Sequence, residues 1–349
     1  MEYVPILRGK VGEFIALSNT SDHVQAHIRP ILEVHPDQRL ADVVRTFARH
    51  AGEYLPAHLA VTVDCGQLWQ HGAVGTGFRG HAMLWLSDAF RDWLHTLIPA
   101  FRTTDPAGCL DEIRQTQQAH GAGGCLCIDL HHLPATPRDL TEDVRGVLDA
   151  VALMPEDTDL LLDAGYLPNA EAVTVLVPRA LEVLSWARTL PWRHVTLAGG
   201  AFPPTLRRVT PHVLTALRRY DLDLWEHVAR RAGGPPPAFG DHGVTHPDPP
   251  APARVRAAPA NLRYTSGRHW YAVRGVGAAG VDTLRLCRQL TRADIWHGTH
   301  TDLSWGDDEI HLRALDLADG PGGPSQRRAW ETSHHLAVVT RSIAERGRP

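Results

Sequence analysis

An alternation of short apolar runs with amphipathic stretches spans the first two-thirds of the 349 residues and constrains the fold more than any other feature. Eight of the apolar runs have the length of strands: Val4–Leu7, Arg29–Val34, Ala60–Cys65, Leu97–Arg102, Cys125–Leu130, Asp159–Asp163, His194–Gly199 and Ala238–Asp241. Strands that alternate with helices form a parallel sheet, and eight such strands close into a barrel. The sequence therefore predicts a (β/α)8 barrel of the TIM type.

Helical patterns separate these runs. In Leu40–Ala48, apolar residues recur at the i, i+3, i+4 and i+7 spacing of one helix face. Similar patterns cover Ser87–Leu97, Ala107–His120, Arg138–Leu153, Ala170–Leu190 and Leu222–Ala232. A doubly wound open sheet is the competing architecture, and it normally has a GxGxxG turn after its first strand. Because Gly9-Lys10-Val11-Gly12 lacks that spacing, the closed barrel is favoured.

The last third of the chain predicts an insertion after the eighth strand. Proline- and glycine-rich stretches mark its connectors. Between them, Asn261–Gly275 alternates as a strand or hairpin, and Val281–Thr291 and Arg327–Arg346 have helical patterns. We therefore expect one barrel domain over residues 1–349, with 242–330 inserted over the carboxyl face and 325–346 as a terminal helix.

Composition narrows the class of protein. A hydrophobic content of 43% and a charged content of 21% are those of a folded globular chain. The net charge of −4 gives no overall attraction for nucleic acid, although a local arginine patch could bind it. No apolar run approaches the ~20 residues that cross a bilayer, so we expect no membrane contact. Five cysteines without a disulfide spacing, and a start without a signal peptide, predict a reduced cytoplasmic protein.

Ionisable residues occur at the ends of seven of the eight predicted strands, in or just after the run: Lys10, Glu33, Asp64, Arg102, Asp129, Asp163 and Asp241. Functional residues of (β/α)8 barrels lie at these carboxyl ends. Capping of turns and helices is the structural alternative for some of the aspartates. It accounts less well for Lys10, Glu33 and Arg102, so the ring of charge indicates a site at the barrel mouth.

Strand alternation predicts which of these side chains point into the barrel. Three aspartates share a face with small or apolar residues: Asp129 with Cys125 and Cys127, Asp64 with Thr62, and Asp163 with Leu161. Inward carboxylates from three strands could provide general acid and base catalysis, or bind a hard divalent cation such as Mg²⁺. Cys125-x-Cys127 by itself is a weak metal motif, and buried thiols that pack the core are the stronger interpretation.

Lys10 is the one lysine among the 35 lysine and arginine residues of the chain. Arginine keeps its proton in proteins, whereas a lysine can shift its pKa, form a Schiff base or act as a compact point charge. Its place beside a ring of carboxylates favours the point charge over the Schiff base, because an aldolase lysine needs apolar neighbours that lower its pKa. An exposed lysine without a function is the alternative.

Two histidine pairs invite a functional and a structural interpretation. His334 and His335 lie on the predicted last helix, either packed with Trp330 against the barrel or with one ring at the mouth as acid, base or anion ligand. His297-Gly-Thr-His300 has a gap seen in some metal sites, but its glycine predicts an exposed loop. Walker A, HExxH and GxSxG motifs are absent from the sequence, and no GxGxxG motif follows the first predicted strand.

Several short motifs follow one another along the chain. They are Tyr3–Phe14 with Lys10 and Gly12-Glu13, Ile28–Val34 with Glu33, Phe239-Gly240-Asp241 with Pro247, Arg263-Tyr264-Thr265 with Trp270, Gly306-Asp307, and Trp330 with His334-His335. In this order, the motifs resemble the beta protein family of phages and bacteria. The chain departs from the family pattern at Glu331-Thr332-Ser333, where a glycine and an asparagine are expected. The resemblance spans nearly the whole chain and highlights these residues as a site. The resemblance implies that the chain is encoded by an accessory gene of a phage or of a defence region. It implies no settled reaction for the family.

Together, the residues and the resemblance predict an enzyme that hydrolyses a phosphodiester or glycosidic bond of a nucleotide or nucleic-acid-like substrate, in phage–host conflict. The predicted catalytic residues are Lys10, Glu33, Asp129, Asp241 and His335, and the predicted substrate-binding residues are Arg263, Tyr264, Thr265, Trp270, Asp307 and His334. The expected partners are an anionic small molecule or nucleic acid, or a phage or defence protein. The alternative is a binding module without catalysis, with a filled barrel mouth and a basic or apolar patch elsewhere.

Overall fold

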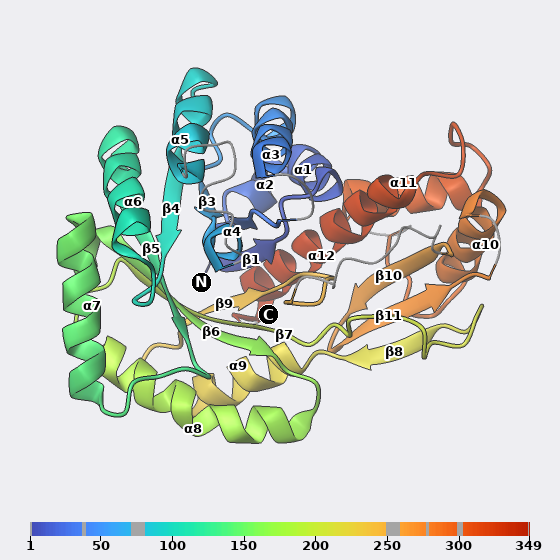
Figure 1. The fold of residues 1–349 in the computed structure, drawn as a ribbon. Helices are drawn as coiled ribbons and strands as arrows, with labels where there is room; N and C mark the ends of the chain where they lie inside the picture. Colours follow the sequence, from blue (N-terminus) through green and yellow to red (C-terminus); the bar gives the residue numbers. More distant parts are fainter. Residues whose placement is uncertain are drawn as a thin grey trace.

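The computed structural model describes residues 2–36, 40–70, 81–248, 259–276, 279–298, 303–347 and 349. Eight parallel strands form a closed barrel in the order β1-β2-β3-β4-β5-β6-β7-β9 (Figure 1). They are β1 (Tyr3–Leu7), β2 (Ile31–Glu33), β3 (Val61–Asp64), β4 (Leu97–Phe101), β5 (Gly124–Asp129), β6 (Thr158–Tyr166), β7 (His194–Gly200) and β9 (Ala238–Asp241). Every predicted barrel strand is present, and the predicted (β/α)8 architecture is confirmed.

Helices surround this barrel, because the outward faces of its strands are apolar and need cover. They are α1 (Val11–Ser18), α2 (Asp22–Gln25), α3 (Leu40–Tyr54), α4 (Gly66–Gln70), α5 (Ala82–Asp92), α6 (Ala107–His120), α7 (Pro137–Val151), α8 (Ala170–Ala187) and α9 (Tyr220–Arg231), with the short 3-10 helix η1 (Pro155–Asp157) before β6. The helix predicted at Ser87–Leu97 lies earlier in the chain, because Leu97 begins β4. The helices α1, α2 and α4 were not predicted.

Side chains alternate between the two faces of each barrel strand, so the buried apolar residues form one cluster inside the barrel and one outside it. Ile6, Ile31, Cys125, Cys127 and Leu161 belong to the cluster inside the barrel. Their strand neighbours belong to the larger cluster between strands and helices. Small residues let the walls approach, and a Cβ on Gly240 would lie 2.7 Å from that of Ala198. The cysteines are buried and free, as the packing interpretation predicted.

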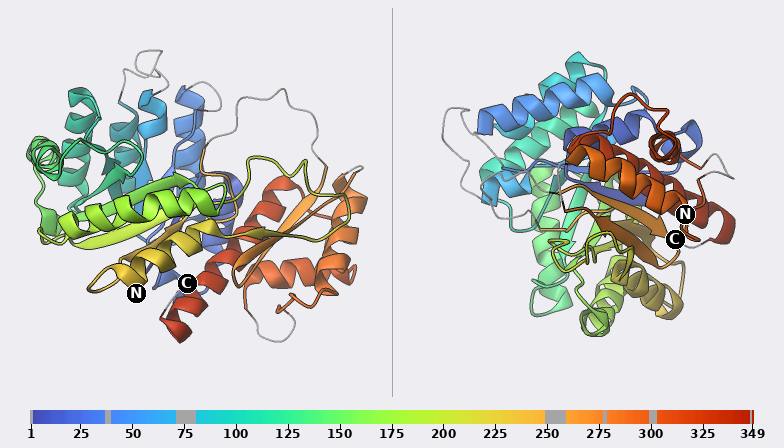
Figure 2. Two further views of the ribbon diagram at one scale, coloured as in Figure 1. Left: turned by 90° about the horizontal axis from the view of Figure 1, so that it is seen from below. Right: turned by 90° about the vertical axis from the view of Figure 1, so that its right-hand side faces the viewer.

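A second, three-stranded antiparallel sheet lies beside the barrel, in the order β10-β11-β8 (Figure 1, Figure 2). The hairpin of β10 (Asn261–Ser266) and β11 (His269–Arg274) was predicted, whereas β8 (Thr215–Arg218) was not. Because β8 precedes β9, the insertion is built from both sides of the last barrel strand. The helices α10 (Ala279–Thr291) and α11 (Trp305–Ala314) complete this C-terminal layer, which has its own apolar cluster around Tyr264, Trp296 and Trp330.

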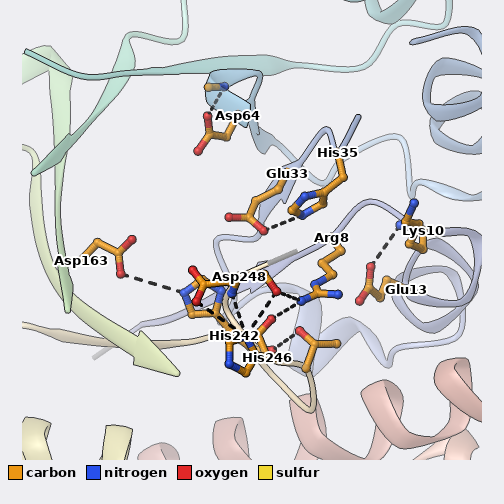
Figure 3. A network of polar contacts seen from close by, with 12 residues as sticks. Arg8, Lys10, Glu13, Glu33, His35, Asp64, Asp163, His242, His246 and Asp248 are labelled. Carbon is orange, nitrogen blue, oxygen red and sulfur yellow. Dashed lines mark hydrogen bonds and ion pairs between the residues drawn. The ribbon is translucent and has the colours of Figure 1, made fainter. Parts of the chain in front are cut away.

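The last helix, α12 (Pro324–Arg346), packs between the barrel and the C-terminal layer. It contacts α1 and β1 on one side and β10 on the other (Figure 1). The elements β10, β11, α10 and α11 of the predicted insertion therefore flank α12. The insertion's segment His242–Asp248 lies at the barrel mouth (Figure 3). In the part of the chain that the structure describes, no helix is both long and apolar enough to span a bilayer.

Candidate functional site

Three inward carboxylates lie at the carboxyl end of the barrel, where the strand register brings neighbouring residues level. Glu33 of β2 pairs in register with Asp64 of β3, and Asp163 of β6 pairs with Asp129 of β5. Glu33 and Asp64 are buried, and Asp163 is half-buried. The alternation predicted for Asp64 and Asp163 places both side chains at the mouth (Figure 3).

Each of these carboxylates has a basic partner. The Nε2 atom of His35 lies 2.9 Å from Oε2 of Glu33. Arg102 donates two hydrogen bonds to Asp64, of 2.9 and 2.5 Å. Although burial raises the pKa of Asp64, the Arg102 guanidinium outweighs it and holds that pKa below its usual value. The Asp64–Arg102 pair is therefore a fixed ion pair that supplies a buried cation to the mouth.

The third pair is looser. Nε2 of His242 lies 4.0 Å from Oδ1 of Asp163, beyond hydrogen-bond distance, and this buried nitrogen has no hydrogen-bond partner among the described atoms. Burial lowers the pKa of His242, but the carboxylates of Asp163, Glu33 and Asp241 raise it more, so the net shift is upward. A buried histidine whose pKa is raised and whose Nε2 has no hydrogen-bond partner among the described atoms is suited to general acid catalysis.

Three arginines hold the segment that follows β9 across the mouth. Arg8 donates to the carbonyl oxygens of His246 and Asp248, the latter at 2.5 Å. Arg263 and Arg328 both donate to the carbonyl of Val244, at 2.8 and 3.1 Å. Arg263 also stacks on Phe202, with its guanidinium carbon 4.6 Å from the ring centre. Burial, followed by repulsion from Arg328, lowers the pKa of Arg263 to about 9.

A cavity of about 440 Å³ opens beside this mouth, between α1, α3 and α12. Its lining combines cations with apolar side chains: Arg8, Lys10, His35, His50, Arg328, Val11, Val34, Val43 and Phe47, together with Gly9, Gly12, Thr46, Pro324 and Ser325. Lys10 is exposed, and its backbone N–H donates to the buried carboxylate of Glu13 at 3.1 Å. The cavity adjoins the ends of β1 and β2, where Arg8 and His35 lie.

Asp241 was expected at the mouth and lies elsewhere, which corrects that prediction. In β9 the small residues Ala238 and Gly240 face inward, so Asp241 faces outward, toward α12. Its carboxylate accepts a hydrogen bond from the Tyr3 hydroxyl at 2.6 Å and one from Arg219 at 3.2 Å. Despite burial, which raises it, these partners and His335 hold the Asp241 pKa well below its usual value.

His335 belongs to the same buried cluster behind the barrel wall. Its Nε2 atom lies 2.9 Å from Oδ2 of Asp241, and its Nδ1 atom lies 2.7 Å from the Thr265 hydroxyl. All three residues are 0% exposed. Burial lowers the pKa of His335. With the proton on Nε2, the ring donates to Asp241, and Nδ1 accepts from the Thr265 hydroxyl. The structure thus places His335 in the packing role and not at the mouth.

Three of the other predicted substrate-binding residues, Tyr264, Asp307 and His334, form a second buried cluster. The His334 ring stacks on Tyr264 with 3.7 Å between ring centres, and its Nδ1 atom lies 3.0 Å from Oδ2 of Asp307. Trp270 packs edge-on against Phe202. Since Tyr264 and Trp270 are at most 1% exposed, neither ring can stack on a substrate base in this conformation. Arg263 is the member of the predicted binding set that reaches the mouth.

Asp129 lies at the turn after its strand. The Asp129 side chain is half exposed and accepts hydrogen bonds at the turn after β5, from the backbone N–H of His131 and from Nδ1 of His132. These hydrogen bonds match the structural alternative for the aspartates, in which the carboxylate caps a turn. No group of three or more His, Cys, Asp or Glu residues within the described ranges is arranged to hold a metal ion. His300 of the His297–His300 motif lies outside the described residues.

Sequence reasoning missed Arg8, His35, His242 and Arg328. The signal for His35 and His242 was present, because alternation continues past the strand ends and places them on the faces of Glu33 and Gly240. No local signal marks Arg8 or Arg328 among 34 arginines, since only tertiary packing brings Arg8, which follows β1, into one cavity with Arg328 of α12.

Comparison with known proteins identifies the family. The profile of the Beta protein family matches residues 3–341. The chain belongs to the Beta protein family. Among solved structures, it is similar to triosephosphate isomerase from Bartonella henselae, with 9% identity, a TM-score of 0.32, and 70% of this chain and 93% of that chain covered. It is also similar to an old yellow enzyme homologue from Zymomonas mobilis, with 12% identity, a TM-score of 0.29, and coverage of 68% and 77%. No curated protein matches it.

Proposed function

We propose that this Beta protein family member is a hydrolase that cleaves a phosphodiester bond in a nucleotide or nucleic-acid-like substrate at the barrel mouth. The observation that carries the proposal is the set of three inward pairs, Glu33–His35, Asp64–Arg102 and Asp163–His242, beside a cationic cavity. Two carboxylate–histidine pairs in one mouth can divide the roles of base and acid between them. The adjacent cations suit a negatively charged substrate.

In the proposed reaction, Glu33 accepts a proton from water while His35 holds its carboxylate by donating from Nε2. The water oxygen attacks phosphorus, and the bond to the leaving oxygen breaks. His242 gives its Nε2 proton to that oxygen, with Asp163 stabilising the charged ring beforehand. The products are a phosphomonoester and an alcohol. Arg102 and Arg8 lie where they can offset charge that develops on the phosphate oxygens.

The test is hydrolysis of bis(p-nitrophenyl) phosphate and of p-nitrophenyl glycosides by the full chain, with and without Mg²⁺. We expect turnover of the phosphodiester, and a 10²- to 10⁴-fold loss in His242→Asn and in Glu33→Gln, the usual range for acid–base groups. His132→Asn and Glu142→Gln are matched controls, since both side chains are exposed, at 82% and 60%.

Turnover of the glycosides alone would move the proposal to glycosidic bonds. Equal rates for all four variants would exclude catalysis by these pairs. If no substrate turns over but long nucleic acid or a protein partner raises the melting temperature, the protein is a binding module instead.

A further inference from the structure

The cavity beside the mouth lies where two helices begin. Val11 and Gly12 open α1, and Pro324 and Ser325 open α12; all four line the cavity. The helices touch closely at this point, because a Cβ on Gly12 would lie 2.4 Å from the Ser325 carbonyl oxygen. The N–H groups in the first turn of a helix have no intrahelical acceptor, and the helix dipole is positive there. Because the N-termini of two helices adjoin this cavity, they favour an anion as its ligand.

Side-chain charge adds to this effect. Arg8, Lys10 and Arg328 line the cavity, and Arg263 lies close behind Arg328. Four carboxylates lie near these cations: Glu331 is 3.5 Å from Arg328, and Glu13, Glu33 and Asp248 attract Arg8. Burial raises the pKa of Glu13 and so weakens its negative charge. None of the four is among the lining residues, so the described lining of the cavity carries cations and no carboxylate.

Unused polar atoms supply an independent observation. His35 is 6% exposed and lines the cavity; its Nε2 is bonded to Glu33, while its buried Nδ1 has no hydrogen-bond partner among the described atoms. The buried Nε of Arg8 also lacks one. The terminal nitrogens of Arg8 and Arg328 donate to neutral backbone carbonyls. A phosphate is a stronger acceptor for a guanidinium than a carbonyl is.

The opposite wall is apolar. Val34 follows β2, and Val43 and Phe47 come from α3. A volume of about 440 Å³ lies within the range of roughly 300–1,000 Å³ typical of small-ligand pockets. The cavity thus offers a cationic end for a phosphate and an apolar side for a flat organic group.

We propose that this cavity binds a terminal phosphomonoester of a nucleotide, with the phosphate at the starts of α1 and α12 and the base against Val43 and Phe47. The binding site stands without catalysis, but its place in a reaction rests on the proposed function. In that reaction, the substrate would be held by its phosphorylated end, and cleavage would take place near that end. In the complex, Nδ1 of His35 would face the phosphate, while Nε2 keeps its contact with Glu33.

Binding to the full chain tests this, with inorganic phosphate, adenosine monophosphate and adenosine as titrants in calorimetry. We expect adenosine monophosphate to bind at least tenfold more tightly than either fragment. Arg328→Gln should weaken its binding tenfold or more, while Arg138→Gln, which removes an arginine that is 86% exposed on α7, should leave it unchanged. Equal affinities for the three titrants, or equal affinities in both variants, would overturn the proposal.

The single lysine provides a second measurement that needs no variant. An amine-reactive reagent should modify Lys10, which is exposed at the cavity, and peptide mass spectrometry separates it from the N-terminal amine. Adenosine monophosphate should slow modification of Lys10 at least fivefold and leave that of the N-terminus unchanged. An unchanged rate at Lys10 under saturating ligand would contradict the proposed site. Binding without hydrolysis would refute the proposed function alone, and hydrolysis without binding here would refute this inference alone.

Discussion

At the scale of single residues, a buried chain of hydrogen bonds links the C-terminal layer to the barrel. The Thr265 hydroxyl, His335 and Asp241 have the order of groups found in catalytic triads, but none is exposed to solvent. We therefore predict that Thr265→Val lowers the free energy of unfolding by about 1–3 kcal/mol, because it leaves a buried ring nitrogen without a partner. Denaturant unfolding measures this. Thr174→Val, on the exposed face of α8, should stay within about 0.5 kcal/mol; a larger loss there than at Thr265 would contradict the prediction.

Asp221 is the residue from which we expect a pH dependence. It is 2% exposed, and neither carboxylate oxygen has a hydrogen-bond partner among the described atoms. Burial raises its pKa to about 7, against the attraction of Arg219. The folded state therefore keeps this proton more tightly than the unfolded state does. The resulting stability is complete below the ordinary pKa of 3.8 and is lost as the pH rises to about 7.

Asp221→Asn removes that titration. We expect the melting temperature of the variant, relative to the unsubstituted chain, to be higher at pH 8 than at pH 5. Thermal unfolding at the two pH values measures the difference. If the variant and the unsubstituted chain differed by the same melting temperature at pH 5 and at pH 8, Asp221 would ionise as freely in the folded state as in the unfolded state.

At the scale of elements, the crossing of α1 and α12 depends on a residue without a side chain. A Cβ on Gly12 would lie 2.4 Å from the Ser325 carbonyl and 2.9 Å from Cβ of Arg328. We predict that Gly12→Ala destabilises the protein by about 1–3 kcal/mol through overpacking. In contrast, Gly146 lies inside α7 with nothing within 4 Å of the place that a methyl group would take, so Gly146→Ala should stabilise by about 0.4–1 kcal/mol. Denaturant titration of both variants checks the opposite signs.

Elements also show what the sequence can and cannot predict. The eight barrel strands are short runs rich in apolar residues, because they are largely buried on both faces, and such runs are visible locally. In contrast, β8 is four residues long and partly exposed, and its pairing with β11 joins Thr215 to Ala272, a contact that no local pattern contains. The prediction for Asp241 was wrong because it counted strand ends without applying alternation to β9, where Phe239 marks the outward face.

At the scale of the whole molecule, the last helix completes both the barrel and the C-terminal layer. Trp330 lies in the apolar cluster of the layer, whereas Leu336 and Val339 lie in that of the barrel. We predict that a chain ending at Gly323 has no cooperative thermal transition, because it exposes two cores at once, while a chain ending at Gly347 unfolds as the full chain does. Circular dichroism during heating distinguishes them. A sharp transition in the shorter chain would show that the barrel folds without α12.

The pairing of β1 with β9 also has a consequence for synthesis. The first strand made is a neighbour of the last barrel strand, with Tyr3 level with Phe239. At about 5–20 residues per second, the ribosome needs on the order of 10–50 s to make the chain between them. During that time β1 has one edge unpaired, and its Val-Pro-Ile-Leu run is open to wrong partners. A nascent chain of this protein should therefore need protection by chaperones until β9 emerges.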